Sequence, residues 1–355
     1  MNAEFIEALN SLEKERGIKK DVLLNAFEAA LCVAYKRNYN STGNVRAEIN
    51  GETGEIHIWA SKTVVENVQN PSQEITLAKA KKVNPLYELG DVLEEEAFTR
   101  DFGRIAAQTA KQVMVQRIRE AERGNIYEEY KEAENEILTA IVQRVEKGNA
   151  YVELGKTDGI LSASEMIPGE TYENNQRLKV YVLEVHKDNK GPQVVVSRTH
   201  PGLVKRLFEL EVPEIMSGVV QIKSIAREPG FRTKVSVWSS DPQVDAVGAC
   251  VGQRGQRVER IVNELYNEKI DIIEWDSDSA IYIAKALSPA KVLMVYVNDE
   301  DKSARVVVPD SQLSLAIGKE GQNARLAAKL TGWKIDIKSQ SQADIMSESA
   351  DSSEE

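Results

Sequence analysis

Two pairs of glycines with the same spacing are the residues of this sequence best placed to do chemistry through the backbone. They occur in Gly252-Gln-Arg-Gly255 and again in Gly318-Lys-Glu-Gly321. Glycine has no side chain, so a Gly-x-x-Gly loop lets another chain come close to its backbone. The N–H groups that open a following helix then face that chain and favour an anion such as phosphate. Each loop is therefore a candidate site for a phosphate-bearing chain.

The two loops are parts of an internal repeat. They start 66 residues apart, and each continues as an amphipathic helix. Each unit then ends in the same strand, Lys269-Ile-Asp-Ile272 in the first and Lys334-Ile-Asp-Ile337 in the second. One Gly-x-x-Gly loop is weak evidence in a chain with 21 glycines, whereas a repeat of loop, helix and strand is much stronger.

Basic side chains at the loops would add Coulomb attraction to the backbone donors. Arg254 lies between the glycines of the first loop, and Arg257 lies in the next turn. We expect Lys319 and Arg325 to hold matching places in the second loop. An alternative is that Arg257 and Arg325, like Arg260, only form the solvent-facing side of amphipathic helices. For Arg254 and Lys319 we favour phosphate contact. The full predicted site comprises Gly252, Gln253, Arg254, Gly255, Arg257, Gly318, Lys319, Glu320, Gly321, Gln322, Asn323 and Arg325.

The sequence shows no pattern for catalysis or metal binding. The three histidines, His57, His186 and His200, lie in different segments without a cysteine or histidine at metal-ligand spacing. There is no Gly-x-x-x-x-Gly-Lys-Ser/Thr loop and no Gly-x-Ser-x-Gly nucleophile. Acidic residues occur in runs such as Glu94-Glu95-Glu96, which are typical of a solvated surface. We therefore predict a protein that is not an enzyme and that uses no metal or cofactor.

The charge of this 355-residue chain is unevenly distributed. The net charge is −11, but residues 218–338, which hold both loops, contain 17 basic and 16 acidic residues. The last segment, 339–355, has five acidic residues and no basic one. A near-neutral region with bases at its loops can bind RNA locally, with a shallow dependence on salt. The length itself suggests two to four domains.

The sequence also predicts where the protein is found. No apolar run approaches the roughly 20 residues of a membrane-spanning helix, and the N-terminus lacks the basic and apolar regions of a signal peptide. Cys32 and Cys250 both lie in apolar helical patterns, as reduced core thiols would. We expect a cytoplasmic protein without membrane contact.

The first 130 residues have the pattern of one α+β domain. Apolar residues recur at helical spacing near the N-terminus and again after residue 100. Between these stretches, two alternating segments flank Asn50-Gly51, which indicates a hairpin. The expected elements are helices at 1–16 and 22–38, strands at 45–49, 56–60 and 75–83, a helix at 101–121, and a charged helix or linker at 122–135.

Residues 136–199 contain short strands separated by turns. Five candidates in so short a segment suggest a small barrel, and the OB fold is the common five-stranded form. A small barrel without a ligand is the alternative. Tyr151, Tyr172 and Tyr181 are the main candidates there for base stacking. The candidate strands are 137–145, 150–154, 159–161, 179–185 and 193–197.

After a linker and short helix at 200–217, two units with the same order of elements follow. Helix, two strands, helix–loop–helix and strand is the order of a bacterial (type II) KH domain. KH domains use a Gly-x-x-Gly loop to clamp about four nucleotides of a single strand. The first unit has strands at 218–226 and 232–238, a helix–loop–helix at 244–266 and a strand at 269–275. The second has a helix at 279–287, strands at 291–297 and 304–308, and a helix–loop–helix at 311–331.

Longer strings of residues resemble one family. Pro309-Asp-Ser-Gln-Leu-Ser-Leu-Ala-Ile-Gly-Lys-Glu-Gly-Gln-Asn-Ala-Arg325 resembles the second KH domain of the NusA family of bacterial transcription elongation and termination factors. Val247-Gly-Ala-Cys-Val-Gly-Gln-Arg-Gly255 and Asp101-Phe-Gly-Arg-Ile-Ala106 resemble earlier parts of the same family. Two departures are minor: Ala246 replaces a proline and Lys285 an asparagine.

The resemblance extends from residue 1 to about 340 and implies a multidomain α+β protein. The implied domains are an N-terminal RNA polymerase-binding domain at 1–130, an S1-type OB barrel at 135–199, and tandem KH domains at 200–276 and 277–340. From its composition, the acidic tail at 341–355 cannot bury enough apolar area to fold, so we expect this tail to be disordered.

The same resemblance implies a function. The protein, a monomer, would bind the RNA polymerase core through its N-terminal domain and nascent single-stranded RNA through its OB and KH domains. It would modulate pausing, termination and, with other factors, antitermination. Candidate polymerase contacts are Lys36, Arg37, Arg104 and Lys111. Two rival classes stay open: an RNA-degrading enzyme with OB and KH accessory domains, as in polynucleotide phosphorylase, and a ribosome-assembly adaptor.

Overall fold

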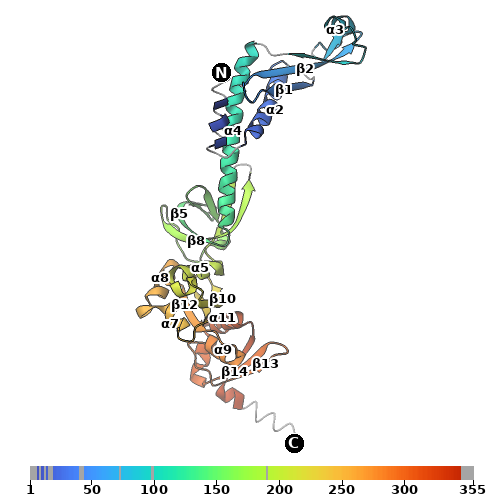
Figure 1. The fold of residues 1–355 in the computed structure, drawn as a ribbon. Helices are drawn as coiled ribbons and strands as arrows, with labels where there is room; N and C mark the ends of the chain where they lie inside the picture. The colour runs from blue at the N-terminus through green and yellow to red at the C-terminus, as the bar shows by residue number, and fades with distance from the viewer. Residues whose placement is uncertain are drawn as a thin grey trace. The chain divides into compact units, whose positions relative to one another are not determined.

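The chain folds into two compact units, Met1–Asn125 and Ile126–Glu355, each with its own core. The computed structural model describes residues 6–7, 9–11, 13–14, 19–39, 44–71, 73–96, 100–188 and 191–344, coloured along the chain in Figure 1. The helix predicted at 1–16 lies largely outside these ranges. No helix that the structure describes is long and apolar enough to cross a membrane.

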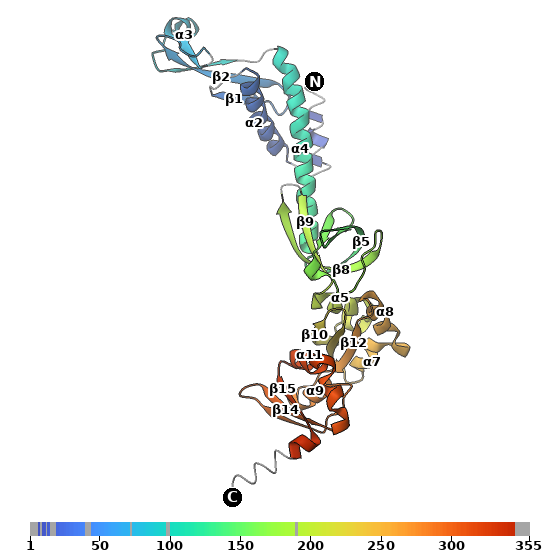
Figure 2. The same cartoon turned by 180° about the vertical axis from the view of Figure 1, so that it is seen from behind.

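The first unit is a mixed sheet with helices packed against it. Its elements are α2 (Lys20–Asn38), β1 (Val45–Ile49), β2 (Ile56–Val65), β3 (Glu74–Thr76), α3 (Leu77–Val83), β4 (Val92–Glu96) and α4 (Arg100–Glu132), which continues into the second unit. Strand β2 pairs antiparallel with β1 and β4 and parallel with β3. Phe27 and Leu31 of α2 pack on Ala47, Ile49 and Ile58 of the sheet. Figures 1 and 2 show α2 alongside β1 and β2.

One prediction for the sheet of the first unit was wrong, and one strand of that sheet was missed. The strand predicted at 75–83 is a short strand, β3, followed by helix α3. The segment Leu77-Ala-Lys-Ala-Lys-Lys-Val83 consists mostly of good helix formers, and this preference outweighs its partial alternation. Strand β4 was not predicted, because Leu93 is its one buried residue and the rest of the strand is an exposed, mainly acidic run.

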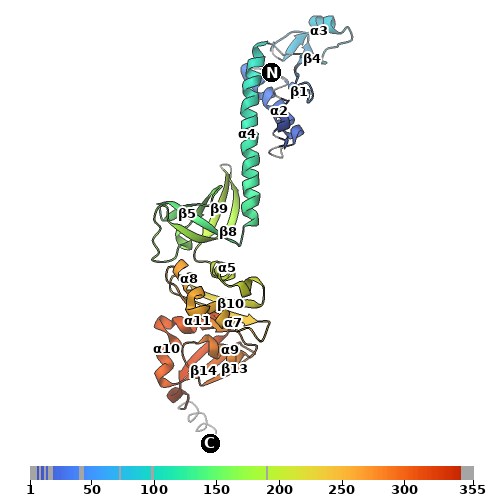
Figure 3. The same cartoon turned by 60° about the vertical axis from the view of Figure 1, so that its left-hand side comes forward.

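The second unit begins with a closed five-stranded barrel, as predicted. Its strands are β5 (Ile137–Glu146), β6 (Asn149–Glu153), β7 (Asp158–Leu161), β8 (Arg177–Asp188) and β9 (Gly191–Ser197). They close in the order β5-β6-β7-β9-β8, with β7 and β9 parallel. Alternate apolar residues such as Val142, Val152 and Val180 fill the interior. Figure 3 shows β5, β8 and β9 around it.

The two repeat units follow the barrel and have the same topology. The first repeat unit comprises α5 (Pro201–Glu211), α6 (Pro213–Met216), β10 (Val220–Glu228), β11 (Arg232–Ser239), α7 (Ala246–Val251), α8 (Gln256–Glu264) and β12 (Lys269–Glu274). The second repeat unit comprises α9 (Ser279–Ala286), β13 (Met294–Asn298), β14 (Ser303–Val308), α10 (Leu313–Ile317), α11 (Gln322–Thr331) and β15 (Lys334–Ser339). In each, an antiparallel pair is completed by a parallel last strand. This confirms the predicted order of elements.

The two repeat units share a buried interface. Ala226 and Ile273, from the sheet of the first repeat unit, belong to the same apolar cluster as Ile283 of α9 and Leu326 of α11. At this interface the fully buried Lys234 donates through Nζ to Asp271 Oδ2 (3.0 Å). It also donates to the Ser288 carbonyl of the second repeat unit (2.8 Å). Burial lowers the pKa of Lys234. Apolar packing and this bridging lysine fix the position of one repeat unit relative to the other.

The chain stays ordered beyond the last strand. Residues 340–344 are helical, and Ser341 Oγ donates to Asp310 Oδ2 at 2.7 Å. Hydrogen bonds from Ser339 and Ser341 lower the pKa of Asp310. For residues 341–344 this structure replaces the predicted disorder, and residues 345–355 lie outside the described part of the chain.

Candidate nucleic-acid interface

The two Gly-x-x-Gly loops have the same backbone conformation. Helices α7 and α10 end at Gly252 (φ 73°, ψ 177°) and Gly318 (φ 78°, ψ 172°). One turn of 3-10 helix follows, and the second glycines, Gly255 and Gly321, have φ of 79° and 75°. The conformation of Gly252 and Gly318 belongs to a region of the backbone map that is nearly exclusive to glycine. The spacing of the glycines is therefore dictated by the loop geometry.

The shared geometry corrects the expected correspondence of the basic residues. The position before the second glycine is left-handed in both loops, and it is Arg254 (φ 53°) in the first and Glu320 (φ 52°) in the second. Lys319 therefore corresponds to Gln253, and Arg325 does not correspond to Arg257. The expectation that Lys319 and Arg325 hold matching places was wrong: the two loops carry opposite charges at the same backbone position.

Arg257 and Asn323 do correspond, and both close the loop from inside. Arg257 Nη1 donates to the Ala249 carbonyl at 2.6 Å. Asn323 Nδ2 donates to the Ala316 carbonyl at 3.0 Å and to the Leu287 carbonyl at 2.9 Å. Asn323 is 3% exposed, so its side chain does not face solvent. These two predicted contact residues hold the end of the preceding helix against the start of the next.

Arg325 and Gln322 are held by a carboxylate of the first repeat unit. Glu228, at the end of β10, accepts a hydrogen bond from Arg325 Nε (2.8 Å) and another from Gln322 Nε2 (2.9 Å). The Arg325 hydrogen bond lowers the pKa of Glu228. Arg325 Nη1 also donates to the Glu320 carbonyl at 2.9 Å. The second loop is thus held against the first repeat unit.

The first loop has acidic neighbours on helices α5 and α6. Arg257 Nη1 lies 2.9 Å from Glu214 Oε2, and Arg260 Nη1 lies 3.1 Å from Glu211 Oε2. These residues line an open groove of about 630 Å³ beside Gly252. Arg260 is paired on the surface, as the alternative reading expected. The carboxylates offset the charge of both arginines.

Arg254 and Lys319 remain available to a ligand. Both are exposed, and within the ranges that the structure describes neither side chain has an internal hydrogen bond or ion pair. The helices behind them, α8 and α11, begin at Gly255 and Gly321 without a side-chain cap. The N–H groups of Gln256 and Gln322 donate within the turn, to the carbonyls of Gln253 and Lys319. The positive end of a helix dipole and one exposed cation therefore meet at each loop.

The second loop faces the first repeat unit across a groove of about 490 Å³. One wall is the turn between β10 and β11 and the start of β12, with Phe231 and Lys269. The other wall is α10 and the loop, with Leu315 and Lys319. Volumes of about 300–1,000 Å³ are usual for pockets that enclose small ligands.

Most of the barrel tyrosines are not available for stacking. Tyr181 is 6% exposed and stacks on His200 at a centroid distance of 4.6 Å. The Tyr172 hydroxyl donates to Glu170 Oε2 at 2.6 Å, and burial raises the pKa of Tyr172. At Tyr151, the guanidinium of Arg144 lies 4.3 Å from the ring centroid. Tyr151 with Arg144 is the remaining stacking candidate on the barrel.

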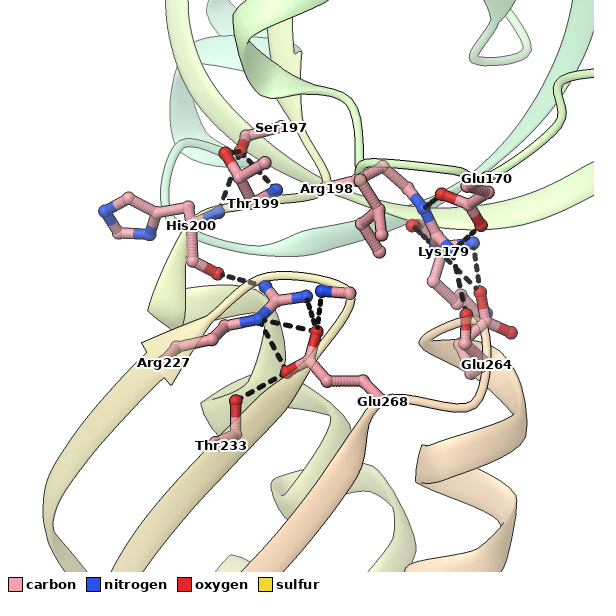
Figure 4. Close-up of polar contacts among 12 residues, drawn as sticks. Glu170, Lys179, Ser197, Arg198, Thr199, His200, Arg227, Thr233, Glu264 and Glu268 are labelled. Atoms are coloured by element: carbon pink, nitrogen blue, oxygen red, sulfur yellow. Dashed lines mark hydrogen bonds and ion pairs between the residues drawn. The ribbon is translucent and has the colours of Figure 1, made fainter. Parts of the chain in front are cut away.

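Sequence reasoning missed a set of buried charges between the barrel and the first repeat unit (Figure 4). Arg198, 1% exposed, pairs with Glu170 of the barrel and donates to the Lys179 carbonyl at 2.7 Å. It also donates to Glu264 at the end of α8, through Nη1 to Oε1 (3.1 Å) and through Nη2 to the carbonyl (2.8 Å). A lone arginine after a strand gives no signal in the sequence. Its partners are 28 and 66 residues away.

The candidate polymerase contacts all lie on the surface of the first unit. Lys36 and Arg37 are in the last turn of α2, and Arg104 and Lys111 are on α4; all four are exposed. Their role stays a prediction. Among the described residues, no three His, Cys, Asp or Glu side chains are grouped as a metal site requires.

A closed five-stranded barrel followed by two tandem units with Gly-x-x-Gly loops defines a multidomain RNA-binding protein. Family models match along the chain: the NusA N-terminal domain at residues 4–124, the S1 RNA binding domain at 131–197, and the NusA-like first and second KH domains at 198–275 and 279–345. The chain belongs to the NusA family.

Similar proteins extend over nearly the whole chain. The transcription termination/antitermination protein NusA of Halalkalibacterium halodurans is 59% identical over 97% of this chain and 90% of its own length. The protein of that name from Bacillus subtilis is 57% identical over 97% and 92%, and that from Thermus thermophilus is 45% identical over 94% and 89%. The solution structure of the N-terminal domain of B. subtilis NusA is 53% identical and covers 35% of this chain and 99% of that one, with a TM-score of 0.31.

Proposed function

We propose that this protein is a non-enzymatic transcription factor that holds nascent single-stranded RNA while bound to RNA polymerase. The N-terminal domain binds the polymerase core, and the barrel and KH domains bind the RNA. It acts as a monomer in the cytoplasm, and with other factors it modulates pausing, termination and antitermination. The observation that carries the proposal is the pair of identically folded loops, each with one exposed basic side chain, in a chain of the NusA family.

The loops bind the RNA backbone. The N-terminal ends of α8 and α11 attract phosphate oxygens, and Arg254 and Lys319 add attraction from the loop itself. The glycines let the strand come close. A clamp of this kind engages about four nucleotides and needs a single strand, since bases in a duplex cannot be splayed out.

Holding RNA and polymerase on one chain makes the second contact intramolecular. The effective concentration of the RNA site near the emerging transcript then rises to the millimolar range typical of short tethers. Weak RNA sites with few phosphate contacts are sufficient under those conditions. This agrees with the near-neutral charge of residues 218–338.

The RNA contact is tested by acidic substitutions in the loops. Lys319→Asp with Glu320→Asp places a carboxylate where phosphate binds, and roughly 3 kcal/mol of repulsion arises between unit charges 5 Å apart at an effective dielectric near 20. Screening reduces this, so we expect about a tenfold or greater loss of affinity in filter binding. Gln253→Asp with Arg254→Asp tests the first loop. Lys82→Asp, an exposed charge change on α3, is the control; equal affinity in all variants would remove the loops from the site.

The rival classes differ in simple assays. An RNA-degrading enzyme would steadily shorten labelled RNA in the presence of magnesium and phosphate, whereas a binding factor leaves it intact. A ribosome-assembly adaptor would co-purify with ribosomal subunits. We expect co-purification with RNA polymerase and full-length RNA after incubation.

A further inference from the structure

A phenylalanine is exposed at the tip of the turn between β10 and β11. Phe231 has 61% of its surface accessible, whereas Phe27 and Phe208 are buried at 2% and 0%. An exposed aromatic ring contributes little to the free energy of folding. Aromatic rings that remain on the surface of nucleic-acid-binding proteins commonly serve as platforms for bases.

The turn that carries Phe231 is rigidly held. The Gly230 N–H donates to Glu268 Oε2 at 2.8 Å, and the Phe231 carbonyl accepts from the Lys269 N–H at 3.1 Å. Glu268 is also paired with Arg227, and both side chains are fully buried (Figure 4). A ring presented on such a turn has little conformational freedom left to lose when a ligand binds.

The turn is also fixed relative to the second Gly-x-x-Gly loop. Glu228, three residues before Phe231, accepts the hydrogen bonds from Arg325 and Gln322 described above. Phe231 and Lys319 consequently line opposite walls of the same groove of about 490 Å³. A strand whose phosphate lies at Gly318 and Lys319 therefore passes in front of the phenylalanine.

The remaining walls of the groove suit one nucleotide. Pro289 and Leu315 add apolar surface, and Leu315 is 44% exposed. Lys269 adds an exposed cation beside Phe231. A flat apolar ring next to cations and backbone donors matches a planar base joined to a phosphate. A purely apolar peptide would leave these lysines without partners.

We propose that Phe231 of the first KH domain is a base-stacking residue for the RNA strand held by the loop of the second KH domain. The proposal rests on the proposed RNA-binding function and assigns a nucleotide subsite built by both domains. The subsite accepts any base, because every base has a π face, and favours purines through their larger rings. Phe231 makes no phosphate contact.

The test is equilibrium binding of the full chain to a single-stranded RNA oligonucleotide at several salt concentrations. Stacking contributes about 1–3 kcal/mol per base, so Phe231→Ala should weaken binding by about 5- to 150-fold at every salt concentration. The slope of log K against log salt concentration should be the same for Phe231→Ala as for the wild type, while Lys319→Ala should lower the magnitude of that slope by about one. Phe231→Trp should retain the affinity. Tyr296→Ala is the matched control, since Tyr296 is 59% exposed and does not line the groove.

Photocrosslinking locates the base directly. An oligonucleotide with one 5-iodouridine, moved through each position in turn, should crosslink to the peptide containing Phe231 from one position and lose that crosslink in Phe231→Ala. Unchanged affinity of Phe231→Ala, or equal losses in Phe231→Ala and Phe231→Trp without a crosslink, would overturn the stacking role while RNA binding stands. A wild-type chain that binds no RNA would instead overturn the proposed function itself.

Discussion

Arg254 and Glu320 occupy the same backbone position in two loops that otherwise fold alike. Both have a left-handed conformation, at φ of 53° and 52°, and both lie just before the second glycine. The first loop therefore presents a cation where the second presents an anion. In the second loop the cation is Lys319, one position earlier. The two clamps share a geometry but not a charge pattern, and they need not bind phosphate equally well.

Exchanging the charges at this position should shift RNA affinity in opposite directions. Coulomb's law gives about 2 kcal/mol for unit charges 8 Å apart at an effective dielectric near 20, and exposure and salt reduce this. We expect Arg254→Glu to raise the Kd for single-stranded RNA about three- to tenfold and Glu320→Arg to lower it by a similar factor. Filter binding at low salt measures both. Changes in the same direction would show that the position does not face phosphate.

At the residue scale, sequence reasoning found the loops but misjudged individual side chains. The glycine spacing follows from backbone geometry and is visible in the sequence. The roles of Asn323 and Arg325 are not, because a polar residue after a loop can face either solvent or the preceding helix. Asn323 is buried because the carbonyls that accept from its Nδ2, those of Leu287, Leu315 and Ala316, lie inside the domain. Phe231 was missed because an aromatic residue in a turn resembles a core residue until its exposure is known.

The helix–loop–helix is the element on which the site depends, and its first glycine is the most constrained position. A Cβ at Gly318 would lie 2.8 Å from the Asn323 backbone nitrogen, in a conformation that other residues avoid. Gly332, at the end of α11, has nearly the same φ, 77°, but nothing lies within 4 Å of its Cβ position. The two glycines also differ in ψ, which is 172° at Gly318 and 15° at Gly332. Gly318 therefore combines a close contact with a conformation nearly exclusive to glycine, whereas Gly332 has only ordinary left-handed strain.

Alanine substitutions at these glycines should differ in cost. Gly332→Ala should lower the free energy of unfolding by about 1–2 kcal/mol, the usual cost of a left-handed residue with a side chain. Gly318→Ala should lower it by about 3 kcal/mol or more, since backbone strain and the close contact add. Urea denaturation followed by circular dichroism measures the difference. Equal effects would mean that the loop adapts to a Cβ at no extra cost.

At the element scale, the repeat predicted more of the fold than any local pattern did. Both repeat units and the five barrel strands were predicted because buried alternation and helical periodicity are strong there. In the first unit the region at 101–135 was divided into a helix and a charged helix or linker, while the structure has one helix, Arg100–Glu132. Its second half is too charged for an apolar stripe to be evident. Strand β4 was not predicted for the same reason, because it too is mainly charged.

At the scale of the molecule, the buried charges around Arg198 decide how the barrel and the first KH domain are held together within the second unit. Arg198 reaches Glu170 and Lys179 on the barrel side and Glu264 on the KH side. Glu264 ends the helix that begins at the first Gly-x-x-Gly loop. The same side chain thus sets the position of the barrel relative to that loop.

Removing Arg198 should destabilise the second unit strongly. Arg198→Met leaves Glu170, which is 4% exposed, as an unpaired buried charge, and breaking such a pair costs about 3–5 kcal/mol. Adding Glu170→Gln removes that charge and should restore part of the loss. Urea denaturation of the full chain measures both variants. A double variant no more stable than Arg198→Met would show that the ion pair does not account for the effect.

The most direct test of the central claim is the lifetime of a hairpin-stabilised pause of bacterial RNA polymerase, measured with and without this protein. The account predicts a longer pause with the wild-type chain and a lifetime near that of polymerase alone when both loops carry the acidic substitutions. A lifetime that the wild-type chain leaves unchanged, although it binds RNA normally, would contradict it.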